Sequence, residues 1–368
     1  MDNKLIILDD YFPNPLTGFR VAEFNYYMTV FPNCYIYSSM PYESYTTFYN
    51  QYAKIYPQFK GRIKFFTDNI QFNCSLFYTV FAGNASYFLK YFEREATPFV
   101  FTLYPGGGFS LSDLNCKSNL IKVCSSKFFK KVIVTQEISY KYLIDNNITT
   151  TDKIEYIYGY VDDSKYFLQN YKIKSCYPQD KQTFDICFVA GKYTSKGIDK
   201  GYDSFIEICK RLSKISDQFR FHVVGGFSSS DIDVSDIKDR IIFYGYRQKE
   251  FFPEFYSHMD IVIAPTVPFF RGTGEFDGFP TGCAVEAGMS GTAVFCTDFL
   301  KLNRSFIDGI DIIILDKDIG KTVSKIIYYK NNPIKLYELS QRGRIKFLNI
   351  FNIDQQMMHR VNLLKSFM

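Results

Sequence analysis

Short apolar runs recur along the first half of the chain, and between several of them the apolar residues follow helical spacing. Leu5–Leu8 is such a run and predicts a buried first strand. Helices are predicted at Val21–Val30, Ser86–Glu95 and Glu137–Asn146. Further strands are predicted at Cys34–Tyr37, Ile63–Phe66, Leu76–Phe81, Phe99–Tyr104, Val132–Thr135 and Ile154–Tyr158. Because strands that alternate with helices favour a parallel sheet, the first half is predicted to be Rossmann-like.

The same alternation begins again at Phe184–Ala190, an apolar run that leads directly into glycine. The next helix has one core-facing stripe at helical spacing, formed by Phe205, Ile208, Cys209, Leu212 and Ile215. Further strands are predicted at Phe221–Val224, Ile241–Tyr244, Ile261–Ala264, Val294–Cys296 and Ile312–Leu315. Glycine loops in this half follow strands, and in a parallel sheet such loops lie at the carboxyl ends, where ligands bind. The pattern therefore predicts a second Rossmann-like domain and an α/β fold class.

A polar, lysine-bearing stretch with no clear period separates the two halves. We place the domain linker there, at residues 166–183. The N-terminal domain then covers residues 1–165, and the second domain covers residues 184–350. Residues 351–368 remain, and most of them form an amphipathic segment that predicts a terminal helix.

Composition fits a globular protein of two domains and narrows its partners. The chain has 368 residues, of which 46% are hydrophobic and 22% charged. Its 30 tyrosines and 39 phenylalanines supply many rings for stacking on sugars or bases. The formal net charge of +5 is spread along the chain, so no nucleic acid is expected as a partner.

Cysteine usage and the absence of long apolar runs indicate a cytoplasmic protein. Nine cysteines are scattered without the paired spacing of a zinc site, as expected of free thiols in a reducing compartment. The first residues predict a strand rather than a signal peptide, and no run approaches the length of a membrane span. Contact with the inner membrane face is at most peripheral. It would involve lysines interleaved with apolar residues, for which a solvated face is the alternative: Lys117, Lys122, Lys127, Lys130 and Lys131.

Residues 275–294 form the most informative stretch, a glycine-punctuated loop followed by a predicted short helix and a strand. Pro280 suits the first turn of a helix, where a missing N–H costs nothing, and Gly278 lets the backbone approach a ligand. The amides at such a helix start favour an anion such as a diphosphate. Glu286 projects from an otherwise apolar helix, where its carboxylate can accept hydrogen bonds from vicinal sugar hydroxyls. A solvated or salt-bridged glutamate is the alternative.

The loop from Gly191 to Gly201 joins the first strand of the second half to its helix. It is not a Walker A motif, because it lacks Gly-Lys followed by Ser or Thr. It carries Lys192, Lys196 and Lys200, and a lysine ammonium is a point charge that neutralises phosphate. With Glu286, these lysines predict a site for a diphosphate and a ribose. Surface lysines on a loop are the alternative.

Other glycine loops after predicted strands are candidates for ligand contact. In the second half they are Gly225-Gly226 and Gly245-Tyr246-Arg247. In the first half, Gly18 and Arg20 are candidates for approaching a phosphate or an acceptor. The glycines of Tyr104-Pro105-Gly106-Gly107-Gly108 permit close approach of a ligand or a mobile lid. For both first-half loops a structural turn is the alternative.

On these residues the chain resembles the retaining glycosyltransferases of GT-B fold, and it is most similar to glycosyltransferase family 4. The segment Glu286–Val294 corresponds to the family's Glu-Ala-x-x-x-Gly-x-x-Val, and Gly278-Phe279-Pro280 resembles its Gly-Phe-Pro element. The resemblance is clearest over residues 184–350 and is one of topology over residues 1–165. It implies two Rossmann-like domains whose parallel sheets face across a cleft, with the terminal helix crossing back to the N-terminal domain.

The resemblance also implies roles for the residues that match the family's motifs. The ribose-binding acid falls on Glu286, and the acid and amides that hold the donor sugar fall on Asp277, Gly278 and Phe279. Lys192 and Lys200 resemble the residues that bind the diphosphate. The loops at Gly191, Gly225-Gly226 and Tyr246-Arg247 would line the donor site.

Spacing leaves two of these assignments open. Asp277 and Glu286 lie about one residue further apart than is usual, so Glu275 is an alternative first acid. The gap between Lys192 and Lys200 is also wide, which leaves Lys196 as an alternative. A histidine that many members carry near the donor sugar is replaced here by Tyr104-Pro105-Gly106.

No metal or cofactor is expected beyond the nucleotide sugar. The histidines, His222, His258 and His359, lie far apart without ligand spacing. Two Asp-x-Asp strings resemble the metal-binding motif of GT-A enzymes. We discount Asp231-Ile232-Asp233 because it lies in a serine-rich loop, and Asp316-Lys317-Asp318 because capping of a helix explains it.

The resemblance thus implies a transferase that moves a sugar from a UDP or GDP sugar to a glycan or lipid-linked glycan, with retention. Family habits point to bacterial surface polysaccharide biosynthesis, with the N-terminal domain binding the acceptor. Catalysis would depend on positioning and electrostatics by Lys192, Lys200, Asp277 and Glu286. A non-catalytic binding subunit or partner of another glycosyltransferase is the main alternative. An epimerase would need further acids and bases near the sugar, which the sequence does not identify.

Overall fold

The structure is a computed structural model that describes residues 3–368. The chain folds into two compact units, each with its own parallel sheet and core. Unit 1 comprises the chain up to Asp163 together with Thr273–Gly278 and Ile353–Met368. Unit 2 comprises Ser164–Gly272 and Phe279–Asn352.

The stretch predicted as a linker, residues 166–183, is folded into unit 2. It overlaps α6 (Ser164–Gln169). Further along, Ser175 N donates to Ser257 O (3.0 Å), and Lys174 Nζ donates to Tyr256 O (3.1 Å). The polar pattern of this stretch therefore reflects polar contacts with unit 2 rather than a free connection.

The sheet of unit 1 has, within residues 3–368, the strand order β3-β2-β1-β4-β5-β6-β7, and all neighbouring strands are parallel. The order reverses between β1 and β4. Every residue of β1, β4 and β5 is buried, which explains why these strands are continuous apolar runs rather than alternating ones. The strands are β1 (Leu5–Asp9), β2 (Cys34–Ser38), β3 (Ile63–Phe65), β4 (Leu76–Val80), β5 (Phe99–Leu103), β6 (Phe129–Val134) and β7 (Ile154–Tyr156).

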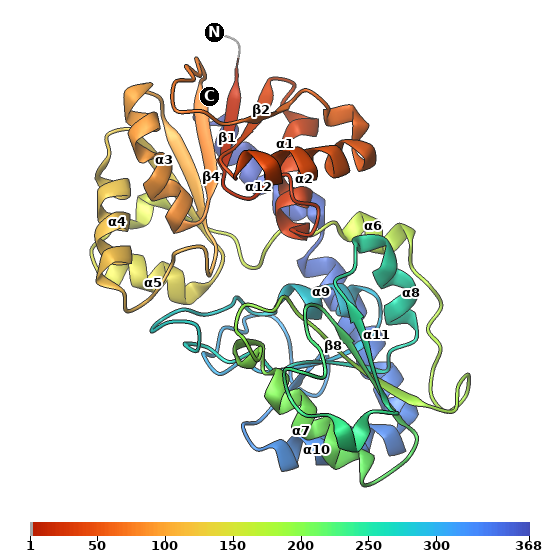
Figure 1. Ribbon diagram of the computed structural model, residues 1–368. Coiled ribbons are helices and arrows are strands. Elements are labelled where there is room, and N and C mark those ends of the chain that lie inside the picture. The colour runs from red at the N-terminus through yellow and green to blue at the C-terminus, as the bar shows by residue number, and fades with distance from the viewer. Residues whose placement is uncertain (1–2) are drawn as a thin grey trace. The chain divides into compact units, whose positions relative to one another are not determined.

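Helices cover both faces of this sheet, with α3, α4 and α5 on one side and α1, α2 and α12 on the other (Figure 1). The terminal helix α12 packs on α1, and its Ile353, Met357 and Val361 lie in the same core cluster as the first strand. The predicted return of this helix to the N-terminal unit is confirmed. The helices are α1 (Gly18–Val30), α2 (Tyr42–Ile55), α3 (Ala82–Arg94), α4 (Leu114–Ser125), α5 (Glu137–Asp145) and α12 (Ile353–Lys365).

The sheet of unit 2 has, over the described residues, the strand order β10-β9-β8-β11-β12-β13, again with parallel neighbours. The order reverses between β8 and β11, and open parallel sheets bind ligands outside the carboxyl ends of strands at such a switch point. The strands are β8 (Phe184–Val189), β9 (Phe219–Val224), β10 (Ile241–Gly245), β11 (Ile261–Ala264), β12 (Ala293–Cys296) and β13 (Ile313–Ile314).

Helix pairs cover this second sheet: α7 packs with α10, and α9 packs with α11 (Figure 1). The α9–α11 approach is close, since a Cβ at Gly288 would lie 2.2 Å from the ring of Phe347. Besides α6, the helices are α7 (Tyr202–Ser213), α8 (Phe252–Ser257), α9 (Gly282–Met289), α10 (Ile319–Asn331) and α11 (Pro333–Ile350). The predicted α/β class with two Rossmann-like halves is confirmed.

Predicted elements recur with shifted ends, and the differences have physical causes. Pro280 is not in the first turn of a helix, because α9 begins at Gly282 and Thr281 is its N-cap. Ile215 lies beyond the end of α7 and is exposed, so it is not part of the core stripe. The sequence pattern did not predict α2, because the stripe that it packs on the core consists of tyrosines rather than aliphatic residues. Tyr52 is buried, and Tyr45 and Tyr49 are partly buried.

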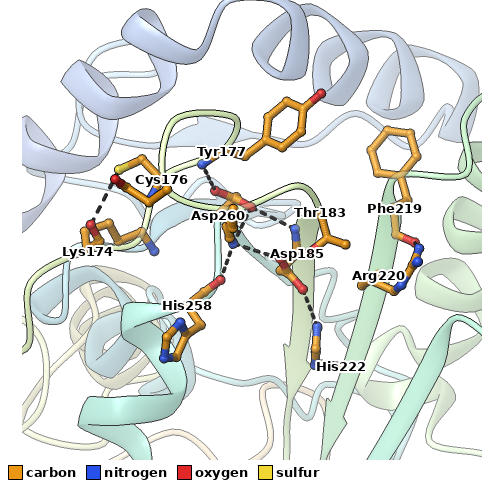
Figure 2. A network of polar contacts seen from close by, with 12 residues as sticks. Lys174, Cys176, Tyr177, Thr183, Asp185, Phe219, Arg220, His222, His258 and Asp260 are labelled. Atoms are coloured by element: carbon orange, nitrogen blue, oxygen red, sulfur yellow. Dashed lines mark hydrogen bonds and ion pairs between the residues drawn. The ribbon is translucent and has the colours of Figure 1, made fainter.

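A charge network lies at the amino ends of β8 and β11 (Figure 2). Lys181 Nζ lies 2.8 Å from Asp185 Oδ2 and 2.8 Å from Asp260 Oδ2, and it also donates to the carbonyl of His258. Asp185 N donates to Asp260 Oδ2 (2.7 Å), while His222 Nε2 donates to Asp185 Oδ1 (2.8 Å). The network ties the former linker stretch to two central strands.

Candidate functional site

The loops after β8, β9 and β10 are tied to one another at the carboxyl ends of these strands. Ala190 N donates to Val224 O (3.1 Å), and Gly225 N donates to Gly245 O (3.0 Å). Gly225 has φ +127°, and a Cβ there would lie 2.0 Å from Ala190 O, so only glycine fits. The structure therefore brings three of the predicted glycine loops into one edge of unit 2.

Gly226 and Tyr246 of the predicted donor site are in contact across two of these loops. A Cβ at Gly226 would lie 2.8 Å from the hydroxyl of Tyr246, and the tyrosine side chain is exposed. Arg247 is exposed as well, and its guanidinium carbon lies 5.5 Å from the ring centroid of Phe251. Tyr246 thus lies on the glycine loop, whereas Arg247 is held by an aromatic neighbour.

The loop Gly191–Gly201 contacts the end of β11, so it lies at the switch point between β8 and β11. Val267 N donates to Asp199 O (3.1 Å). Gly201 has φ +73°, and a Cβ there would lie 2.1 Å from Pro265 O, which excludes other residues. Lys200 ends the short 3-10 helix Ile198–Lys200, directly before Gly201 and α7.

The three lysines of this loop have different surroundings. Lys192 Nζ lies 2.5 Å from Asp231 Oδ1, with side chains only 21% and 10% exposed. Lys196 is exposed, and Lys200 is partly exposed. The Asp231 carboxylate therefore balances the charge of Lys192 within unit 2, whereas the sequence alone predicts the same role for Lys192 and Lys200.

Asp231 is the residue that sequence analysis missed. Burial raises its pKa, but the hydrogen bonds from Lys192 and from the amide of Ser228 outweigh that effect, so the pKa of Asp231 lies below its ordinary value. Asp231 was discounted as part of an Asp-x-Asp string. The two partners are 39 residues apart and no local pattern joins them, so only the fold reveals the pair.

Helix α9 presents Glu286 as the sequence predicts. Ala284, Val285, Ala287 and Met289 are buried, and Glu286 is partly exposed. Phe279 and Pro280, which precede the helix, are buried.

The start of α9 lies near both Lys200 and Glu286. Thr281 does not cap the helix amides with its side chain, and its hydroxyl lies 3.4 Å from Cys283 Sγ. Burial raises the pKa of the Cys283 thiol to about 11; the bond with Thr281 lowers it, the Glu286 carboxylate raises it further and the Lys200 ammonium lowers it. Because both charges act on one thiol, Lys200 and Glu286 lie within electrostatic range of the same helix start.

The two alternative first acids, Glu275 and Asp277, belong to unit 1, although the sequence analysis placed them in the second domain with Glu286. Both side chains are partly exposed, so exposure does not distinguish them. Gly278, which follows, packs near the side chains of Gln136 and Pro105 in the same unit.

The segment Thr273–Gly278 is held by the loop after β5. Ser110 Oγ donates to Thr273 O (2.7 Å), and Leu111 N donates to Gly274 O (3.0 Å). The ring centroids of Phe276 and Phe109 lie 5.9 Å apart. These contacts explain why a segment so late in the sequence belongs to the first unit.

The candidate residues of the first half lie at the carboxyl edge of unit 1. Gly18 is exposed at the start of α1. Gly107 approaches the β4 end closely, since a Cβ there would lie 2.2 Å from the ring of Phe81, and Gly106 precedes it in the same turn. The loops after β4 and β5 are joined by Gly83 N, which donates to Gly107 O (2.9 Å).

Arg20 and Tyr104 are engaged in buried contacts rather than presented at this edge. Arg20 Nε lies 3.0 Å from Asp9 Oδ2, and its Nη2 lies 2.8 Å from Asp10 Oδ1. The hydroxyl of Tyr104 donates to Glu23 Oε2 (2.9 Å), and both residues are buried. Within this fold, Arg20 orders the β1 loop and Tyr104 satisfies a buried carboxylate.

Two features of residues 3–368 concern membranes and metals. None of the helices there is long and apolar enough to cross a membrane. No group of three or more His, Cys, Asp and Glu side chains in that range has the arrangement of a metal site.

Residues 184–332 match the family Glycosyl transferases group 1. The match covers less than half of the chain and runs from the first residue of β8 to the residue after α10. It therefore contains the glycine loops of unit 2, the lysine loop and Glu286.

A protein described as an uncharacterized 41.2 kDa protein in the cps region of Klebsiella pneumoniae is 24% identical over 196 residues, which cover 52% of this chain and 49% of that protein. The chain thus spans about half the length of this curated relative.

Solved structures share the fold of the whole chain. A glycosyltransferase from Rickettsia africae has a TM-score of 0.73 and 14% identity, with 100% of this chain and 99% of that chain covered. HepE of Anabaena, solved in complex with UDP, has a TM-score of 0.72 and 13% identity over 99% and 100% of the two chains. Sucrose-phosphate synthase of Thermosynechococcus elongatus has a TM-score of 0.69 and 13% identity over 99% of each chain. The fold is therefore GT-B, built from two Rossmann-like units.

Proposed function

We propose that this chain is a glycosyltransferase that moves a sugar from a nucleotide-diphosphate sugar of UDP or GDP type to a glycan or lipid-linked glycan. The observation that carries the proposal is the carboxyl edge of unit 2. There, three glycine loops are tied together, Lys200 ends the loop after β8, and Glu286 projects from α9. These groups suit a diphosphate and a ribose, and the Glycosyl transferases group 1 match covers them all.

In the proposed mechanism the protein acts through positioning and electrostatics. Lys200 and the amides at the start of α9 stabilise the diphosphate as it leaves, and Glu286 holds the ribose. An acceptor hydroxyl then attacks the oxocarbenium-like sugar from the face that the diphosphate has left. A phosphate oxygen of the leaving group takes the hydroxyl proton. Because the new bond forms on the face that the diphosphate has left, the sugar configuration is retained. Lys192, paired with Asp231, holds the β8 loop in place.

Unit 1 is proposed to bind the acceptor, and one of Glu275 and Asp277 is proposed to contact the donor sugar. The cps region relative and the family resemblance both favour a bacterial surface glycan as product. A lipid-linked acceptor would bring the protein to the inner face of a membrane.

The decisive experiment is a calorimetric titration with UDP and GDP, followed by a transfer assay with the sugar nucleotide of whichever binds. We expect one nucleotide diphosphate to bind and its sugar to be transferred to a glycan acceptor. Absence of binding to both would favour a partner subunit. An epimerised donor formed without acceptor would favour an epimerase.

Two finer parts of the proposal have separate readouts. Transfer in the presence of EDTA at the rate seen without it would support a metal-independent reaction, and loss of transfer would contradict it. Proton NMR of the first product formed would report the anomeric configuration. Inversion there would contradict the front-face mechanism.

A further inference from the structure

Tyr193, which the sequence analysis did not assign, lies beside the glycine that follows β8. A Cβ at Gly191 would lie 3.1 Å from the Tyr193 hydroxyl, so the side chain folds back over the backbone of the loop. The residue is nevertheless 67% exposed. The ring therefore lies at the carboxyl edge of unit 2 with much of its surface open.

Two cations from separate loops gather on this ring. Lys200 Nζ lies 4.9 Å from the centroid, and the guanidinium carbon of Arg271 lies 5.2 Å from it. Lys200 comes from the loop after β8, and Arg271 from the loop after β11. Like charges repel, so an aromatic ring that attracts both is a physical reason for their proximity. The ring thus spans the switch point of the sheet.

Lys192 and Lys200 differ in what their charges face. The Lys192 ammonium lies 2.5 Å from a carboxylate, so the Lys192–Asp231 pair adds little net positive charge to the edge. Lys200 lies on the Tyr193 ring and within electrostatic range of the start of α9. Lys200 and Arg271 therefore share one ring, while a role of Lys192 at the diphosphate stays a prediction.

We infer that Tyr193 is a positioning residue that sets Lys200 and Arg271 for the diphosphate of the donor. This inference rests on the proposed function and adds two residues to its site. Tyr193 acts through the face of its ring, so its hydroxyl is not required. Tyr246, which lies on Gly226 with Arg247 turned to Phe251, serves the nucleoside end of the same ligand.

The test is calorimetry with UDP, GDP, uridine and guanosine on the full chain. For the wild type we expect one diphosphate to bind, and its nucleoside to bind more weakly. Tyr193→Leu should weaken diphosphate binding about fivefold and leave nucleoside binding within about twofold, because leucine removes both cation–π contacts. Tyr193→Phe should restore diphosphate binding, which a role for the hydroxyl would not allow. Arg271→Gln should reproduce the effect of Tyr193→Leu.

Controls separate this inference from the proposed function. Tyr337→Leu removes another exposed tyrosine of unit 2, on α11, and should bind both ligands as the wild type does. Tyr246→Leu should weaken nucleoside and diphosphate binding by the same factor. If the wild type binds a diphosphate and both Tyr193→Leu and Arg271→Gln bind it equally tightly, the inference is overturned and the proposed function stands. Equal loss of nucleoside and diphosphate binding in Tyr193→Leu would also overturn it. A wild type that binds neither diphosphate would overturn both.

Discussion

The two edges of the unit 2 sheet hold charges in opposite ways. At the amino edge, Lys181 lies between Asp185 and Asp260, and all three side chains are at most 13% exposed. At the carboxyl edge, Lys200 and Arg271 lie on a tyrosine that is itself exposed. The amino edge joins its charges in one buried network, whereas at the carboxyl edge the Lys192–Asp231 pair lies beside two cations that share an aromatic ring.

The charges at the amino edge hold the fold together, whereas those at the carboxyl edge are the ones we propose for donor binding. The amino edge contains two buried carboxylates with perturbed pKa values, Asp185 and Asp260. Burial raises the pKa of Asp185, but the hydrogen bond from His222 and the Lys181 ammonium outweigh it and hold the pKa below its ordinary value. Burial dominates at Asp260 and raises its pKa. Shifted pKa values are often taken as a sign of a functional site. Here the shifted carboxylates bind Lys181 and thereby hold residues 166–183 to β8 and β11.

The largest expected effect is at the amino edge, with Lys181→Met. This variant leaves two buried carboxylates without their shared cation, and breaking a buried pair costs about 3–5 kcal/mol. Urea unfolding at pH 7 would measure the loss of unfolding free energy. The matched control is Lys321→Met, which breaks the exposed pair with Asp316 and should leave stability almost unchanged, because solvent screens an exposed pair. If both variants lowered the free energy of unfolding by the same amount, the special structural role proposed for the amino edge would be wrong.

The next effect is at the carboxyl edge, with Glu286→Ala and Lys200→Ala. Each should lower transfer at least tenfold, about 1.4 kcal/mol of transition-state binding, with little change in stability. Initial rates at saturating acceptor, with circular dichroism to verify folding, would measure this. Glu254→Ala on α8 is a control, since that glutamate pairs with His258 on an exposed surface. Full activity in a folded Glu286→Ala protein would contradict the assignment of Glu286.

The smallest effect is a gain of stability in Lys174→Met. Burial lowers the pKa of Lys174 from 10.5 to about 8, although Asp260 opposes the shift. Between these two pH values the unfolded chain binds a proton that the folded chain does not, so wild-type stability should rise as pH rises through that window. At pH 7 the buried charge carries its full cost, and replacing it with methionine should stabilise the fold by about 1 kcal/mol.

Thermal unfolding between pH 7 and pH 10.5 would test this prediction. Lys174→Met should flatten the pH dependence of the midpoint, while Thr292 still donates to Tyr256 O (2.9 Å). Lys172→Met, at an exposed neighbouring position, should change neither the midpoint nor its pH dependence. A less stable Lys174→Met protein would show that the hydrogen bonds of Lys174 outweigh its desolvation.

Local pattern was enough to predict much of the fold. Parallel strands that are buried on both faces are mostly apolar, so β1, β8 and β11 appear as short apolar runs in the sequence. The buried carboxylate in β8, Asp185, is paired with Lys181 and His222. The apolar surroundings of Glu286 predicted a helix with one projecting carboxylate, and α9 has that form. Helix α2 was not predicted because its core-facing stripe consists of tyrosines, of which Tyr52 is buried and Tyr45 and Tyr49 are partly exposed.

The partners of charged residues could not be predicted in the same way. Arg20 looked like a phosphate ligand because it follows a glycine loop, but the turn after β1 returns it to Asp9 and Asp10. Lys192 looked equivalent to Lys200 until the β9 loop brought Asp231 to it. In both cases the sequence gives the residue type and the loop, while the partner depends on how loops from different strands meet.

The sequence by itself determined the alternation of strands and helices, the two Rossmann-like units and the loops that carry glycine and lysine. It could do so because burial and backbone conformation constrain residues that are close in the chain. Only the tertiary structure decided that Thr273–Gly278 joins unit 1, that Lys192 is neutralised, and that Lys200 and Arg271 share the ring of Tyr193. These outcomes depend on electrostatic and packing contacts between distant segments, whose strength is set by distance and burial rather than by order in the chain.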